Sequence, residues 1–166
     1  MLHMYSKIKF AIISIFFFTT LRAQIYSLEP LVNEATKHPA PIEIQQKMYE
    51  IESKNLQECL LYNQKMPKTN YFSAIKIKIH PTKKSYLVFP SKYCKAFFGA
   101  HAIAYWLFCQ NNKGKYVNVY SGKSDGIEIR KNKQSTFNNI ESFYGNSSIE
   151  LTFDTEKFKY IRDDSK

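Results

Sequence analysis

The 166-residue chain carries 24 basic and 14 acidic residues, which give it a formal net charge of +10 at neutral pH. Its length fits one domain, and a content of only five glycines excludes a low-complexity or linker protein. Beyond residue 23, lysine outnumbers arginine by 19 to 2. This ratio argues against specific recognition of nucleic acid, because bidentate contacts to phosphates and bases rely on arginine.

Residues 1–23 are predicted to be a cleavable signal peptide. Lys7 and Lys9 precede an unbroken apolar run over residues 10–18, and the small residue Ala23 stands at the expected cleavage edge. The run is shorter than the roughly 20 residues that a membrane-spanning helix needs. We therefore expect a periplasmic or secreted protein that is soluble after cleavage. Cleavage would remove three basic residues and no acid, which leaves a net charge of +7.

The N-terminal part of the predicted mature chain is expected to be helical. Residues 24–40 are interpreted as a lead-in segment with proline breaks, and Pro41 suits a first helical turn. An apolar stripe follows, with one slip of its helical phase near Ser53. The stripe fits either one helix of about 24 residues or two shorter helices, and Pro67 ends it in both cases.

After Pro67 the apolar period changes to two, which predicts strands. The expected strands cover residues 72–80, 86–89, 103–109, 116–120, 127–130, 149–153 and 158–160, with tight turns at 111–114 and 154–157. Residues 103–109 are apolar on both faces and are expected to form a central strand, whereas residues 131–147 are polar and mixed. The prediction is a single α+β domain over residues 41–166, with the helical segment packed on an antiparallel meander of six or seven strands.

Charge is distributed unevenly along the chain. Between Glu58 and Asp125 there are eleven lysines and no acid, which predicts one strongly electropositive region. Lys76 and Lys78 lie on the outward face of the strand over residues 72–80, so we expect them to contact a partner. The alternative is an ordinary solvated surface.

The loop over residues 90–102 is the second predicted contact region. It combines five aromatic or cationic side chains, which is typical of a protein-binding hot spot held by strands. These residues are Tyr93, Lys95, Phe97, Phe98 and His101. In the alternative interpretation, Phe97 and Phe98 simply close the open end of the sheet.

Three cysteines allow at most one intramolecular disulfide. Cys94 precedes the strand that Cys109 closes, so these two lie too far apart to be bridged. The pattern favours a Cys59–Cys94 disulfide, and the alternative is three reduced, buried thiols. A nucleophilic Cys94 activated by His101 is the enzyme hypothesis, although no third orienting group is marked.

No cofactor is expected, and no metal site is predicted. The histidines of the mature chain, His38, His80 and His101, have no recognised ligand spacing.

Five segments of the second half of the chain carry a resemblance to known proteins: Tyr93-Cys94, residues 104–108, residues 113–116, residues 136–140 and residues 153–160. With these segments the chain resembles a loosely defined group of small exported bacterial β-rich proteins. In residues 136–140, Thr136 and Asn139 replace the glycine and aspartate of the group's pattern. Some exported proteins of similar build inhibit cell-wall hydrolases or act as immunity partners of antibacterial toxins. The resemblance thus implies a non-enzymatic inhibitor or immunity protein.

The sequence therefore suggests three functions. The first is a binding protein for an acidic protein partner, a toxin or a cell-wall hydrolase. The second is an envelope-surface protein that binds anionic lipid or glycan through its lysines. The third is the cysteine-dependent enzyme.

Overall fold

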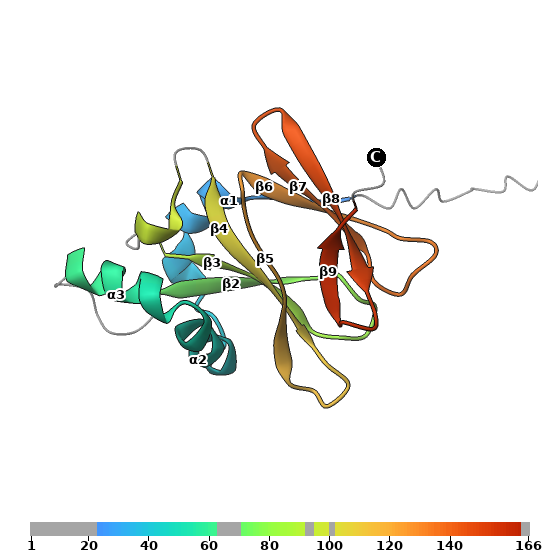
Figure 1. Ribbon diagram of the computed structural model, residues 1–166, viewed down its shortest axis with the longest axis horizontal. Coiled ribbons are helices and arrows are strands. Elements are labelled where there is room, and N and C mark those ends of the chain that lie inside the picture. Colours follow the sequence, from blue (N-terminus) through green and yellow to red (C-terminus); the bar gives the residue numbers. More distant parts are fainter. Residues whose placement is uncertain (1–22, 63–70, 92–94, 100–101, 164–166) are drawn as a thin grey trace, which may run out of the picture.

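The computed structural model describes residues 23–62, 71–91, 95–99 and 102–163, and over these residues it is an α+β protein. Nine strands form two antiparallel sheets, and three α-helices accompany them (Figure 1). The four-stranded sheet contains, in spatial order, β2 (Phe72–Ile77), β3 (Ser85–Pro90), β4 (Ile103–Gln110) and β5 (Tyr116–Ser124). The five-stranded sheet contains, in spatial order, β1 (Gln24–Ser27), β6 (Gly126–Arg130), β7 (Asn139–Tyr144), β8 (Ser147–Asp154) and β9 (Lys159–Arg162).

The four-stranded sheet is the middle layer of the domain because both of its faces are covered. Strand β4 lies between β3 and β5, and all its residues from Ala104 to Cys109 are buried. This confirms the prediction of a central strand that is apolar on both faces. Alternate side chains of β4 enter two different cores: Leu107 faces the five-stranded sheet, whereas Trp106 faces the helices.

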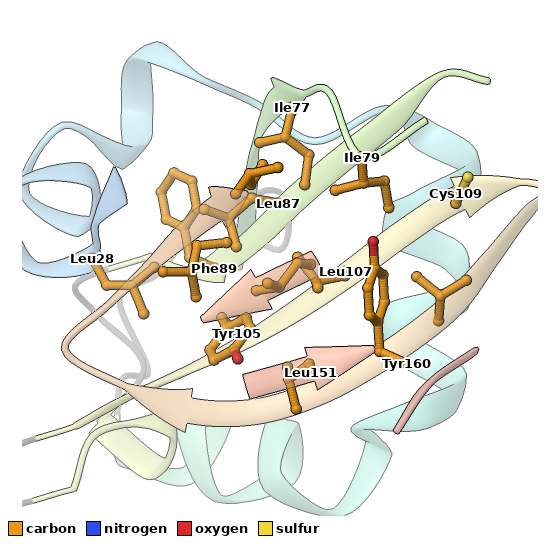
Figure 2. Packing of buried hydrophobic residues seen from close by; sticks show 14 of the residues in the cluster. Leu28, Ile77, Ile79, Leu87, Phe89, Tyr105, Leu107, Cys109, Leu151 and Tyr160 are labelled. Carbon is orange, nitrogen blue, oxygen red and sulfur yellow. The ribbon is translucent and has the colours of Figure 1, made fainter. Parts of the chain in front are cut away.

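The first core fills the space between the two sheets (Figure 2). Leu87 and Leu107 from the middle sheet are fully buried there, as is Leu151 from β8. Burying one such side chain contributes about 1.5–3 kcal/mol. Ser142 of β7 is buried beside this core and accepts a hydrogen bond from the Tyr105 hydroxyl at 3.0 Å.

The second core lies between the middle sheet and helices α2 (Ile42–Ile51) and α3 (Ser53–Tyr62). Ile44 and Met48 of α2 are fully buried against the sheet. Of the two alternatives that the apolar stripe left open, one long helix or two shorter ones, the structure has the two shorter helices, with the break at Glu52. That residue accepts a hydrogen bond from the Trp106 indole nitrogen at 3.0 Å, so it both ends α2 and satisfies a buried donor.

Residues 24–40, expected to lead into the domain, carry regular structure of their own. They form β1, helix α1 (Leu28–Asn33) and the 3-10 helix η1 (Ala35–Lys37). Leu28 is fully buried in the inter-sheet core. Residues 38–40 then run beside β2, where the amide of Ala74 donates to the carbonyl of His38 at 2.9 Å. The segment is therefore part of the domain.

The described part of the chain has nine strands rather than six or seven, because the sequence pattern predicts no strand at β1 or β7. The seven predicted strands correspond to β2–β6, β8 and β9, and the predicted hairpins β4–β5 and β8–β9 are present. The sheets are also two rather than one meander, because the chain passes from β5 into β6 through a corner at Asp125.

Candidate functional site: a lysine-rich end of the sheets

Three turns that are distant in sequence meet around Lys83. The Lys83 ammonium donates a hydrogen bond to the side-chain oxygen of Asn112 at 2.6 Å, which joins the β2–β3 turn to the β4–β5 turn. The same ammonium lies 5.7 Å from the centroid of the Phe158 ring, which joins it to the β8–β9 turn. In Figure 1 these turns lie at the lower right of the molecule.

Six lysines of the three turns and their flanking residues form a region that we call the basic end, and Lys78, which directly follows β2, belongs to the groove described below. The six lysines of the basic end are Lys83, Lys84, Lys113, Lys115, Lys157 and Lys159. Five of these side chains are exposed, and only Lys83 is half-buried. The acids within the three turns are Asp154, which pairs with Lys157 at 3.3 Å, and Glu156. Glu43 of α2 also reaches this region, because its carboxylate accepts a hydrogen bond from the Tyr116 amide at 3.0 Å. Positive charge therefore dominates the basic end.

An aromatic cluster supports the basic end from below. The rings of Phe137 and Phe153 stack with centroids 3.5 Å apart, and Phe158 packs edge-on to Phe153 at 5.3 Å. Tyr160 packs edge-on to Phe153 and donates its hydroxyl hydrogen to the carbonyl of Asn138 at 2.7 Å. Ring packing and this hydrogen bond thus hold the β8–β9 turn, which carries Lys157 and Lys159, against the five-stranded sheet.

Phe158 adopts a φ of 50°, which is rare for a bulky side chain. Its neighbours hold it there, because the ring packs edge-on against Phe137 and Phe153 and the Lys83 ammonium lies over it. Asp154 fixes the rest of the turn by accepting hydrogen bonds from the amides of Glu156 and Lys157, both at 3.0 Å. These bonds lower the pKa of the Asp154 carboxyl.

His80 organises the β2–β3 turn without adding charge to it. Its Nδ1 accepts hydrogen bonds from the amides of Thr82 and Lys83 at 3.1 and 3.2 Å, and its ring lies 4.6 Å from that of Phe137. Burial, and then the nearby Lys83 ammonium, lower the pKa of His80 below its usual value. The imidazole is therefore neutral at neutral pH.

A groove of about 590 Å³ extends the basic surface beside these turns. Lys78, Arg130 and Lys131 line it together with amide and hydroxyl side chains. Arg130 forms ion pairs with Glu128, at 2.9 Å, and with Glu141. The two lysines are exposed and carry the positive charge of the groove.

The structure places the predicted contact residues in different environments. Lys76 and Lys78 are exposed, Lys76 opposite Tyr86 in the β2–β3 pair and Lys78 in the groove. Phe97 is 2% exposed and packs against Phe72 and Trp106, with ring centroids 5.4 and 5.3 Å away. Its ring is part of the core, as in the alternative interpretation, and it is not available for contact with a partner.

The rest of the predicted loop site is only partly described. Phe98 is half-buried, and Lys95 begins the 3-10 helix η2 (Lys95–Phe97). Tyr93 and His101 lie outside the residues that the structure describes. The β2–β3 turn and this loop flank β3 at its two ends, about 17 Å apart at a rise of 3.4 Å per residue. The two predicted contact regions therefore lie at opposite ends of the middle sheet.

The cysteines differ in state. Cys59 is disulfide-bonded, whereas Cys109 is free and buried between the sheets. Cys94, its predicted partner and the nucleophile of the enzyme hypothesis, lies outside the described residues. Burial raises the pKa of the Cys109 thiol, which accepts a hydrogen bond from the Ser85 hydroxyl at 3.4 Å.

Sequence reasoning found part of the basic end and missed the rest. Lys83, Lys84, Lys113 and Lys115 belong to the acid-free stretch that predicted a positive region. Lys157 and Lys159 lie among acids near the C-terminus, and only the packing of the β8–β9 turn against Lys83 adds them. The sequence predicts the turn at residues 154–157, and the alternation of Lys157, Phe158 and Lys159 is the signal that could have indicated its place in a basic surface.

Comparisons of the chain with protein family models, curated proteins and solved structures give no match. No helix within the described residues has the length and apolar character to cross a membrane. Within the same residues, no group of three or more histidine, cysteine, aspartate or glutamate side chains could hold a metal ion.

Proposed function

We propose that this chain is exported and works as a non-enzymatic binding protein whose basic end contacts an acidic partner protein. The convergence of six lysines on three turns around Lys83 carries this proposal. Complementary charge accelerates encounter between proteins and disfavours partners of like charge. The resemblance to small exported bacterial proteins supports an inhibitor or immunity role toward a toxin or a cell-wall hydrolase.

The chemistry of the basic end fits an encounter led by charge. Lysine is a flexible point charge, so an array of exposed lysines attracts an acidic surface without demanding one geometry. Phe158, half-buried beneath Lys83, adds an apolar contact on a fixed backbone. Association should therefore weaken as salt is raised.

Export is supported by the position of the expected cleavage site. Ala23 is exposed and immediately precedes β1, so cleavage after it would leave every described element intact. Mass spectrometry of the protein from the periplasm or medium of its host should find an N-terminal peptide that begins at Gln24. A protein that retains residues 1–23 in that fraction would contradict this part of the proposal.

Affinity capture with charge-reversal variants tests the partner. Tagged mature protein is incubated with host periplasm at low and at raised salt, beside a Lys84→Glu, Lys113→Glu, Lys115→Glu variant. A matched control reverses three lysines outside the basic end, Lys47→Glu, Lys54→Glu and Lys123→Glu. We expect the wild type and the control to retain one stoichiometric acidic protein at low salt. Raised salt and the basic-end variant should both lose it.

The result that overturns the acidic partner is equally concrete. If no protein is retained, and the wild type instead binds vesicles of anionic phospholipid or an anionic envelope glycan, the basic end anchors the protein to the envelope. If the control variant loses the acidic protein as completely as the basic-end variant, total charge determines binding and the three turns have no special role.

A further inference from the structure

A second groove lies at the end of the middle sheet opposite to the basic end. It has a volume of about 940 Å³, and its walls come from α1, the start of β4, the β5–β6 corner and the β7–β8 turn. In Figure 1 α1 and the β7–β8 turn lie in the upper half of the molecule, away from the β4–β5 turn at the bottom. We call it the α1 groove.

The floor of the α1 groove is apolar. Phe98 and Ile103 are half-buried and form an isolated antiparallel bridge, while Pro30 and Val32 contribute from α1. The amide of Gly99 donates to the carbonyl of Ala102 at 2.7 Å, which fixes the backbone of this wall. An apolar side chain of a ligand would therefore meet a preformed surface.

Among the described lining residues of the α1 groove, the charged side chains are acidic. Glu29 and Asp125 line it, and the lining residues that the structure describes include no lysine, arginine or histidine. Asp125 is held in place: its carboxylate accepts a hydrogen bond from the Gly145 amide at 2.7 Å, and its carbonyl accepts one from the Leu28 amide at 2.9 Å. Its charge thus has a fixed position in the groove.

We propose that the α1 groove binds a cationic side chain adjoining an apolar one, on a partner segment that presents lysine or arginine beside an aromatic or aliphatic residue. The carboxylates of Glu29 and Asp125 complement the cation, and Phe98 and Ile103 accept the apolar group. The groove has the opposite charge to the basic end and does not depend on it. The two sites can therefore be tested separately.

A pair of small probes of equal size and opposite charge tests the proposal in the full mature chain. Phenethylammonium and phenylacetate are titrated separately while amide NMR signals are followed. We expect phenethylammonium to shift the amides of Gly99, Ala102 and Gly145 in a saturable way. It should bind at least about tenfold more tightly than phenylacetate, because each probe has the same ring and only the cation is complementary to the carboxylates.

Isosteric neutralisation supplies the second readout. In a Glu29→Gln, Asp125→Asn variant the hydrogen-bond acceptor for Gly145 remains, so the fold should be kept while phenethylammonium affinity falls about tenfold. The control variant Glu50→Gln removes a charge on the exposed side of α2 and should bind as the wild type does. The amide spectrum and the thermal unfolding midpoint establish that each variant is folded.

Three outcomes would overturn the proposal. The first is equal affinity for the two probes as read from the groove amides of Gly99, Ala102 and Gly145, the second is shifts confined to amides outside the groove, and the third is unchanged cation binding in the doubly neutralised, folded variant. None of them bears on the basic end, whose capture experiment uses variants with an intact α1 groove.

Discussion

His80 illustrates how one side chain sets a local response to pH. Its Nδ1 accepts two backbone hydrogen bonds in the β2–β3 turn, and its pKa is lowered by burial and then by Lys83. Phe137 packs on the ring and carries no charge. The unfolded chain therefore binds a proton on this residue more readily than the folded chain does in the window below pH 6.5.

We predict that stability falls as pH is lowered from 7.5 through this window, and that His80→Asn reduces the fall. Asparagine does not titrate, and its side-chain oxygen can accept the same two backbone hydrogen bonds. The measurement is the urea midpoint of both proteins at pH 7.5, 6.5 and 5.5, compared as slopes. An equal decline in the two proteins would show that other groups cause it.

At the scale of the element, the pairing of β1 with β6 depends on a glycine in β6, Gly126. A Cβ at Gly126 would lie 2.7 Å from the carbonyl oxygen of Tyr26 and 3.4 Å from the Cα of Ser27, both in the β1 backbone. That backbone cannot rotate away as a side chain can. The close approach of β1 to β6 therefore requires glycine at this position.

We predict that Gly126→Ala destabilises the protein by about 1–3 kcal/mol, the usual range for forcing extra volume into a packed site. Hydrogen exchange at the amides of β1 should accelerate at the same time. The comparison variant is Gly122→Ala, whose added methyl would meet side chains rather than the backbone of β1: Cε1 of the half-buried Tyr120 at 2.7 Å and the buried Tyr105 ring at 3.3 Å. Equal destabilisation by the two variants, with β1 protection unchanged, would contradict this account.

The cysteines contribute to stability in different ways. Cys59 of α3 is disulfide-bonded, and Cys109 is a buried thiol with a raised pKa. We predict that peptide mapping without reduction joins Cys59 to Cys94, and that iodoacetamide modifies Cys109 only after unfolding. Cys59→Ser should cost about 3–4 kcal/mol, given the length of loop that the predicted pair closes. A Cys109 thiol that reacts rapidly in the native protein would contradict the burial described here.

Regular elements with one buried face could be predicted from the sequence, and those with mixed faces could not. Alternation of isoleucine and lysine predicted β2. The phase slip near Ser53 made two helices one of the alternatives, and the helix break lies at Glu52, whose carboxylate accepts the hydrogen bond of the Trp106 indole. Strand β7 was missed because one of its two buried positions is Ser142, which is satisfied by Tyr105 rather than by apolar contact. Helix α1 was missed because its six residues are too few to show a period.

At the scale of the whole molecule, the basic end and the α1 groove have described side chains of opposite charge, and no single segment reveals this. The basic end gathers lysines from three turns, whereas the α1 groove at the other end of the middle sheet carries Glu29 and Asp125. The acid-free stretch between Glu58 and Asp125 predicts a positive region. Its position at one end of the sheets follows from sheet topology and from the contacts of Lys83, which are long-range and leave no local pattern.

The two contact regions that the sequence suggested, the lysine face of β2 and the loop over residues 90–102, lie toward opposite ends of the middle sheet. Lys76 and Lys78 lie toward the basic end, and Phe98 lies in the wall of the α1 groove. Phe97 was included in the loop site because sequence alone cannot distinguish an exposed aromatic ring from one that closes a core. In the structure it closes the core beside Trp106.

The association rate constant of the captured acidic partner, measured at low and raised salt, tests the central claim most directly. For the wild type and the Lys47→Glu, Lys54→Glu, Lys123→Glu control we predict the same rate at low salt and a steep fall with salt. Reversal of Lys84, Lys113 and Lys115 should lower the low-salt rate about tenfold or more, because steering charges act mainly on encounter. Equal association rates for all three proteins, independent of salt, would contradict a function of the basic end in partner binding.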